Sequence, residues 1–120
     1  MTNAKSGTDL INDAKARIRE TSPREALALH AKGGVTFLDV RDQQEVNLGK
    51  IPGALHISRG TMETKIEAAV PRDAEIVVYC ASGNRSALAA DSLKQMGYDR
   101  VSSLAGGFRG WAEAGGEIDG

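Results

Sequence analysis

A strong strand pattern runs almost directly into a helical pattern in the middle of this 120-residue chain. The run IVVYC (76–80) is apolar and rich in β-branched residues, which favours a buried strand. A helical pattern covers 86–96 and stops at Gly97, a residue type that suits a helix C-terminus. The one cysteine of the chain, Cys80, therefore stands at a junction between a strand and a helix.

Strand and helix patterns alternate along the rest of the chain, which favours an α/β fold. In such folds a parallel sheet is covered by helices on both faces, with right-handed crossovers, and ligands bind outside the carboxyl ends of the strands. We expect strands at 35–40, 76–80 and 101–104 and a short strand within 51–57; helices at 8–20, 23–32, 62–70, 86–96 and 108–114; and a helical turn at 42–49.

Composition and charge exclude several classes of function. Fifteen Lys and Arg against 16 Asp and Glu give a net charge of −1, which does not favour nucleic-acid binding. No apolar run could span a bilayer, and the N-terminus lacks the apolar core of a secretory signal, so we expect a cytoplasmic protein without a membrane partner. No Cys/His cluster has zinc-like spacing, and we expect neither a metal nor a cofactor.

The loop CASGNRS (80–86) has the composition of an anion-binding turn. Backbone N–H groups at a helix start lack partners within the helix and lie at the positive end of its dipole. Gly83 allows a left-handed backbone, and amides that curl around the Cys80 sulfur would lower the pKa of the thiol. Arg85 adds a forked cation suited to an oxyanion. The alternative is that Cys80 is an inert buried side chain, sealed beneath apolar residues.

Four segments resemble motifs of the rhodanese (sulfurtransferase) family, in the order in which the family carries them. CASGNRSALAADSLKQMGY is similar to its active-site segment, of the form Cys-x-x-Gly-x-Arg-Ser in single-domain bacterial members. FLDVRDQQEVNLGKIPGALHI, YDRVSSLAGGFRGWAEAGGEI and TSPREALAL resemble three further family motifs. The resemblance covers about residues 19–118, and we therefore expect an N-terminal helical extension at 1–18 and a rhodanese domain at 19–120.

The resemblance implies a three-layer sandwich around a five-stranded parallel sheet, whose extra strand precedes Ser22. It also implies a thiosulfate sulfurtransferase-type enzyme, in which Cys80 takes a sulfur from a donor such as thiosulfate and becomes a persulfide. The acceptor would be cyanide or a thiol, including that of a thioredoxin-like or other protein. The substrate-binding residues would be those of the loop: Ala81, Ser82, Gly83, Asn84, Arg85 and Ser86.

Several further residues are candidates for supporting the loop. Asp39 and Arg41 end the neighbouring strand, where we expect a buried ion pair that braces the Cys80 loop, with Glu45 in the same network or exposed. Gly106 and Gly107 would form a tight turn close to the loop.

The aromatic and histidine positions are more ambiguous. Trp111 would lie either beside the mouth of the site or in the core. We expect His56 to be partly buried without a catalytic task, and His30 to be solvated on its helix.

Two departures from the family pattern leave other functions open. Lys50 stands where the family carries a histidine, and Ala81 stands where many relatives carry an arginine that could bind thiosulfate. A persulfide carrier in a sulfur relay and a non-catalytic interaction module therefore remain alternatives. A phosphatase or arsenate reductase is disfavoured, because those enzymes place five residues between cysteine and arginine, whereas four separate Cys80 from Arg85.

Overall fold

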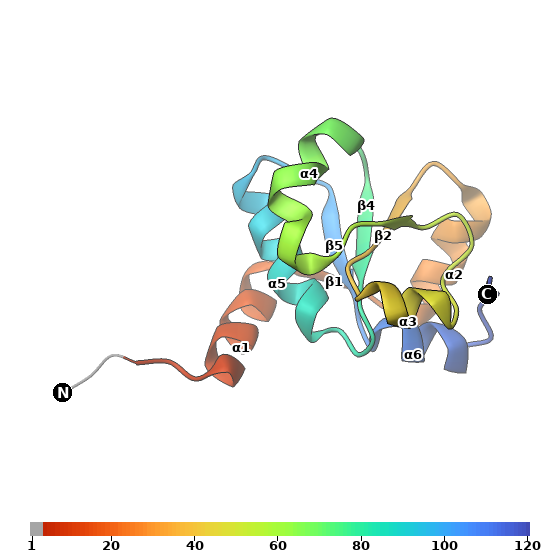
Figure 1. Cartoon of the computed structure of the whole chain (residues 1–120), viewed down its shortest axis with the longest axis horizontal. Helices are drawn as coiled ribbons and strands as arrows, with labels where there is room; N and C mark the ends of the chain where they lie inside the picture. Colours follow the sequence, from red (N-terminus) through yellow and green to blue (C-terminus); the bar gives the residue numbers. More distant parts are fainter. Residues whose placement is uncertain (1–3) are drawn as a thin grey trace.

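A parallel sheet runs through the middle of the molecule, and helices cover both of its faces (Figure 1). The computed structural model describes residues 4–120. The five strands lie side by side in the order β1-β5-β4-β2-β3, and every pairing is parallel. The expected α/β fold with a five-stranded parallel sheet is thereby confirmed. The strands are β1 (Arg19–Thr21), β2 (Thr36–Asp39), β3 (Leu55–His56), β4 (Ile76–Tyr79) and β5 (Val101–Leu104).

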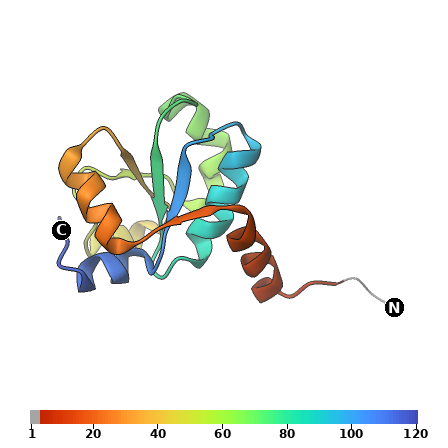
Figure 2. The ribbon, with the colours of Figure 1, turned by 180° about the vertical axis from the view of Figure 1, so that it is seen from behind.

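The helices divide between the two faces of the sheet (Figure 2). One apolar cluster joins the sheet to α4 and α5, and α1 packs along α5. A second cluster joins the opposite face to α2 and α6. The helices are α1 (Gly7–Arg17), α2 (Pro23–Lys32), α3 (Gln43–Asn47), α4 (Met62–Ala69), α5 (Asn84–Gln95) and α6 (Gly107–Glu113), and a short 3-10 helix, η1 (Arg59–Thr61), precedes α4.

The central strand β4 sends alternate side chains to the two clusters. Ile76 and Val78 face the α4 and α5 side, and Val77 and Tyr79 face the α2 and α6 side. All four are buried, as expected for an inner strand of a parallel sheet. Cys80 follows directly and continues the alternation, so its side chain points toward α4 and α5.

The first two helices begin at capping boxes, and the first ends earlier than expected. At α2, Ser22 and Glu25 exchange side-chain and backbone hydrogen bonds, as the sequence predicts. Ser6 and Asp9 form the same capping box at α1, where the sequence analysis named no cap. Helix α1 ends at Arg17, earlier than the expected 20, because residues 19–21 pair with β5 as strand β1.

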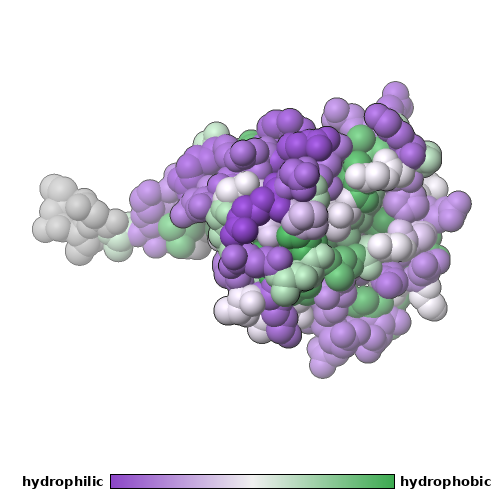
Figure 3. Space-filling view, turned by 90° about the horizontal axis from the view of Figure 1, so that it is seen from above, coloured by the Kyte–Doolittle hydropathy of each residue, from purple (hydrophilic) through white to green (hydrophobic). Residues whose placement is uncertain are grey.

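The face of the molecule shown in Figure 3 is mainly hydrophilic, with apolar residues exposed in places. Among the large apolar residues, Leu10, Leu48 and Ile118 are the exposed ones in the described part of the chain. No helix within residues 4–120 is long and apolar enough to cross a membrane.

Candidate active site

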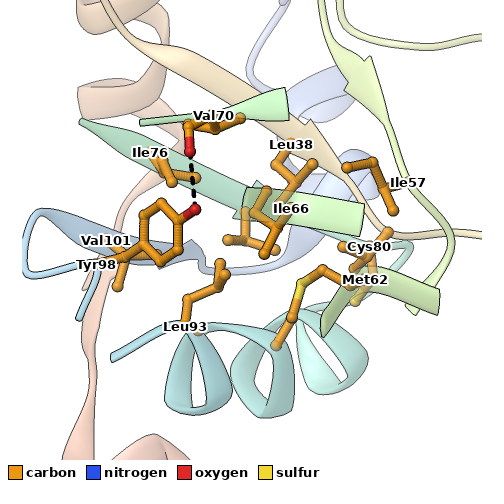
Figure 4. Close-up of a cluster of buried hydrophobic side chains, with 14 residues drawn as sticks. Leu38, Ile57, Met62, Ile66, Val70, Ile76, Cys80, Leu93, Tyr98 and Val101 are labelled. Atoms are coloured by element: carbon orange, nitrogen blue, oxygen red, sulfur yellow. Dashed lines mark hydrogen bonds between the residues drawn. The ribbon is translucent and has the colours of Figure 1, made fainter. Parts of the chain in front are cut away.

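Cys80 directly follows the carboxyl end of β4 and lies at one edge of an apolar cluster, near Ile57 and Met62 (Figure 4). Its side chain belongs to the same cluster as Ile57 and Met62, and the residue is only 1% exposed. The sulfur is therefore covered in this conformation and does not line an open surface. The alternation along β4 could have predicted this burial, because Cys80 shares a face with Ile76 and Val78.

Main-chain amides nevertheless converge on the sulfur, as the loop composition predicts. The Gly83 and Ser86 amides donate to Cys80 Sγ at 3.1 and 3.4 Å. Gly83 has a φ of 107°, a left-handed conformation that side chains rarely adopt, and it aims its own amide inward. The Ser86 hydroxyl oxygen adds a third polar contact with Sγ at 3.5 Å. The loop thus has the geometry of a cradle for one anionic atom.

The electrostatics of the loop favour the thiolate. Burial raises the pKa of Cys80, because desolvation penalises the charged sulfur. Hydrogen bonds from the Ser86 hydroxyl and from the amides of Ser86, Gly83 and Ser82 outweigh that effect, and the pKa is lowered overall. The thiolate is therefore more populated near neutral pH than that of an ordinary cysteine.

Arg85 points its guanidinium at a carboxylate, where the sequence suggested an oxyanion site. Its NH1 and NH2 atoms donate to the two carboxylate oxygens of Glu45 at 2.9 and 2.8 Å, and Asp42 lies 3.9 Å away. Hydrogen bonds from Arg85 lower the pKa of Glu45 to about 2. Of the two expectations for Glu45, it is partly exposed, and it is not hydrogen-bonded to Asp39 or Arg41: the guanidinium of Arg85 engages both of its oxygens instead.

Asp39 and Arg41 form the expected buried ion pair, but with other neighbours than expected. Arg41 NH2 donates to Asp39 Oδ2 and to the Gly49 carbonyl oxygen, both at 2.7 Å. The His56 ring bonds the Arg41 carbonyl oxygen at 2.8 Å, so this ring nitrogen has a main-chain partner. Among residues 4–120, neither member of the pair has a side-chain hydrogen bond to the Cys80 loop. The pair therefore holds the Gly49 segment to the end of β2.

The turn at Gly106 and Gly107 presses the start of α6 against the Cys80 loop. The Phe108 amide donates to the Cys80 carbonyl oxygen at 2.8 Å, and the next amide of α6 donates to the Ala81 carbonyl oxygen at 3.2 Å. A Cβ atom on Gly107 would lie only 2.5 Å from the Cys80 oxygen. The two backbones can approach this closely only because residue 107 is glycine.

Trp111 and His30 lie on the face of the sheet opposite Cys80. Trp111 is buried in the second cluster, and its Nε1 donates to the Glu117 carbonyl oxygen at 2.7 Å. Of the two readings of Trp111, the core position is the observed one. The expectation of a solvated His30 is wrong, because α2 packs on α6: the ring lies edge-on to Phe37 and Trp111 and bonds the Pro52 carbonyl oxygen.

Helix α1 contacts the site from outside, which the sequence analysis missed. Lys15 Nζ donates to Oδ1 of Asn84, the first residue of α5, at 3.2 Å. Further along α5, Arg17 donates from Nε to Asp91 Oδ1 at 2.9 Å and from NH2 to Asp91 Oδ2 at 2.7 Å. The basic residues of the last turn of α1 gave a signal for this, because they could pair with whatever helix lies alongside.

The described residues give no sign of a metal centre. Within residues 4–120, no group of three or more His, Cys, Asp and Glu side chains is placed to hold a metal ion.

The fold and the loop define a class of α/β proteins that hold a cysteine sulfur among main-chain amides where the central strand meets its helix. Residues 22–114 match the model of the rhodanese-like domain, and the chain belongs to that family. It is 38% identical to the thiosulfate sulfurtransferase GlpE of Pseudomonas entomophila over 96 residues, which cover 80% of this chain and 86% of the relative. The expected family is thereby confirmed.

Two solved structures illustrate the range of functions among similar folds. A Rhodopseudomonas palustris protein of unknown function, described as a possible tyrosine phosphatase, has a TM-score of 0.89 and 35% identity, covering 99% of this chain and 98% of that one. The polysulfide-sulfur transferase homodimer of Wolinella succinogenes has a TM-score of 0.79 and 30% identity, covering 92% and 84%.

Proposed function

We propose that the protein is a sulfurtransferase that carries sulfane sulfur on Cys80. The thiolate attacks the outer sulfur of a donor such as thiosulfate, the donor S–S bond breaks, and the electron pair leaves with sulfite. A thiolate or cyanide acceptor then attacks the outer sulfur of the persulfide, and the electron pair of that bond returns to Cys80. The observation that carries this proposal is the convergence of the Gly83 and Ser86 amides on Sγ.

The amides would assist both half-reactions. In the first step they would stabilise the attacking thiolate by hydrogen bonds. In the second step they would stabilise the same thiolate when Cys80 is the leaving group. A covalent persulfide divides one transfer between two anions into two displacements at a single sulfur atom. A reducing compartment such as the cytoplasm would keep the lone thiol in the form that this cycle needs.

The burial of Cys80 adds a requirement to the reaction. A donor must reach the sulfur of a residue that is 1% exposed, so groups around Sγ would have to move before attack, and the loop residues 81–83 are the candidates because the Gly83 amide bonds the sulfur. Ser82 is exposed and Ala81 is half-buried, so this segment borders solvent. The rate of persulfide formation would then depend on the frequency of this opening as well as on the donor.

A persulfide carrier within a sulfur relay is the second candidate, and one observation favours it. Ala81 offers no charge to thiosulfate, and Arg85 is already bonded to Glu45. A donor that needs less positive charge, such as a small or protein-bound persulfide, suits this site better than a dianion. The acceptor would be a small thiol or a protein thiol, for example that of a thioredoxin-like protein.

The phosphatase and interaction-module alternatives have less support. Four residues separate Cys80 from Arg85, one fewer than the phosphatases place there, so fewer main-chain amides are available to surround a phosphoryl group. The description of the Rhodopseudomonas relative as a possible phosphatase is nevertheless a reason to test this activity. An interaction module would not require the thiolate-stabilising contacts at Cys80.

Intact-mass spectrometry of the purified protein tests these alternatives. The protein is incubated with thiosulfate or with a small persulfide, and Cys80→Ser is the control. Gain of one sulfur atom from thiosulfate, lost on adding cyanide, supports the transferase. Gain from the persulfide alone supports the carrier. Absence of any gain from either donor, or Cys80-dependent hydrolysis of an aryl phosphate, would refute the proposal.

A further inference from the structure

Two buried serine hydroxyl groups form a hydrogen-bonded series that starts at the Cys80 sulfur. The Ser86 hydroxyl oxygen lies 3.5 Å from Sγ and 2.8 Å from the hydroxyl oxygen of Ser103. Both serines are completely buried. Among residues 4–120, Ser86 is the hydrogen-bond partner found for the Ser103 hydroxyl. Ser103 is therefore linked to the cysteine by polar contacts through Ser86.

Ser103 occupies a position where an apolar residue would be expected. It lies on β5 in register with Val78 of the central strand, and its neighbour Ser102 bonds Thr21 instead. Inner strands of parallel sheets are normally Val, Ile and Leu, because a buried hydroxyl is unfavourable without a partner. A hydroxyl at Ser103 thus needs a reason beyond packing, and its one partner touches the cysteine.

In this hydrogen-bonded series, every hydroxyl proton has an acceptor only when the sulfur is an anion. With a thiolate, Ser103 donates to Ser86 and Ser86 donates to Sγ, so that both hydroxyl protons have acceptors. With a thiol, S–H donates to Ser86 and Ser86 donates to Ser103. The Ser103 proton then has no acceptor among the hydrogen bonds of the described residues. Each serine keeps its own proton throughout; only the direction of donation reverses.

We propose that Ser103 is a positioning residue, which orients the Ser86 hydroxyl toward Cys80 and thereby favours the thiolate. The inference rests on the proposed function, since it says how that site keeps its sulfur anionic. Arg85 interacts with the sulfur electrostatically, whereas Val40, which follows β2, and Met62, at the start of α4, pack with Cys80 as apolar residues of one cluster.

The test is a pH titration of the thiolate by its ultraviolet absorbance, with Cys80→Ser protein subtracted to remove the tyrosines. Ser103→Ala is expected to raise the pKa of Cys80 by about half a pH unit, which is about a threefold smaller ratio of thiolate to thiol below the pKa. Ser102→Ala is the matched control, since it removes a buried hydroxyl from the same strand whose partner is Thr21. It should leave the pKa unchanged.

A double-mutant cycle tests whether Ser103 acts through Ser86. Ser86→Ala should raise the pKa by about one unit, because it removes the direct contact with the sulfur. Adding Ser103→Ala to Ser86→Ala should then change nothing further. If Ser103→Ala does not fold, Ser103→Thr and Ser103→Val replace it, because the two side chains have nearly the same shape and only threonine keeps the hydroxyl.

Three results would overturn the inference: a folded Ser103→Ala protein with the wild-type pKa, an equal shift in Ser102→Ala, or an undiminished shift in the Ser86→Ala background. None of these measurements requires sulfur transfer. If the wild-type protein titrates as expected but gains no sulfur from any donor, the proposed function fails while the role of Ser103 stands.

Discussion

Two arginines follow neighbouring strands, and they differ in almost every respect. Arg41 is 4% exposed, bonds both oxygens of the buried Asp39 and lies over the rings of Tyr79 and Phe108. Arg85 is bonded to Glu45 alone at short distance, and both of those side chains are about one-third exposed. A buried charge cannot leave its partner without a large desolvation cost, whereas a half-exposed one can exchange its partner for water or a ligand. Arg41 is thus fixed, whereas Arg85, although bonded to Glu45, can exchange that partner for another.

The largest expected effect comes from breaking the buried pair. Arg41→Ala leaves the Asp39 carboxylate buried without its cation and should lower the free energy of unfolding by about 3–5 kcal/mol. Urea denaturation at neutral pH measures this difference. Arg85→Ala is the matched control and should lose about 1 kcal/mol or less. Equal losses from the two variants would contradict the distinction drawn between the arginines.

Glu45→Gln sharpens the comparison by releasing Arg85 while leaving it in place. The variant loses about 1 kcal/mol or less of stability, because the pair is partly solvated. The freed guanidinium can then bind an anion, and we expect the KM for thiosulfate to fall about threefold with kcat little changed. Steady-state assays at fixed ionic strength measure both constants. A higher KM would show that Glu45 positions Arg85 for the donor.

The same pair should make stability depend on acidity over a defined range. The folded-state pKa of Glu45 is about 2, against 4.5 as the usual value. Its contribution is therefore fully present above about pH 5 and is lost as the pH falls from 4.5 through about 2. The stability gap between wild type and Glu45→Gln should shrink over this range in urea titrations. A gap that stays constant down to pH 2 would exclude the ion pair as its cause.

The smallest expected effect concerns Lys15, a third cation near the loop. Lys15→Ala should change stability by less than about 0.5 kcal/mol, because the residue is at the surface. We expect the KM for thiosulfate to rise about twofold at low ionic strength and the difference to vanish at high salt. Lys5→Ala removes the same charge from the segment before α1, where Lys5 pairs with Asp13 and not with the Cys80 loop, and should have no effect. An effect of Lys15→Ala that persists at high salt would indicate a structural cause.

Local features of the site could be predicted from the sequence, because short stretches of chain determine them. The turn at Gly83, the amides around Cys80 and the close approach at Gly107 each follow from a glycine next to a strand end or a helix start. The parallel sheet follows from the alternation of patterns. The division into an N-terminal extension (1–18) and a rhodanese domain (19–120) stays a prediction.

Features that depend on contacts distant in sequence could not be predicted. Arg85 and Glu45 are 40 residues apart, and nothing in either segment marks the other as its partner. Ser86 and Ser103 meet only because β5 lies beside β4 in the sheet. His30 has polar neighbours along the chain, yet the packing of α2 on α6 encloses it.

The tight contact at Gly107 also determines how the loop can open. Main-chain amides at the start of α6 donate hydrogen bonds to the Cys80 and Ala81 carbonyl oxygens, so the first two residues of the loop are held in place. The free edge of the loop is at Ser82, next to the Asn84 and Arg85 side chains that α1 and α3 hold. A donor should therefore enter from the side of these two helices, and bulky groups there would close the entrance without touching the cysteine.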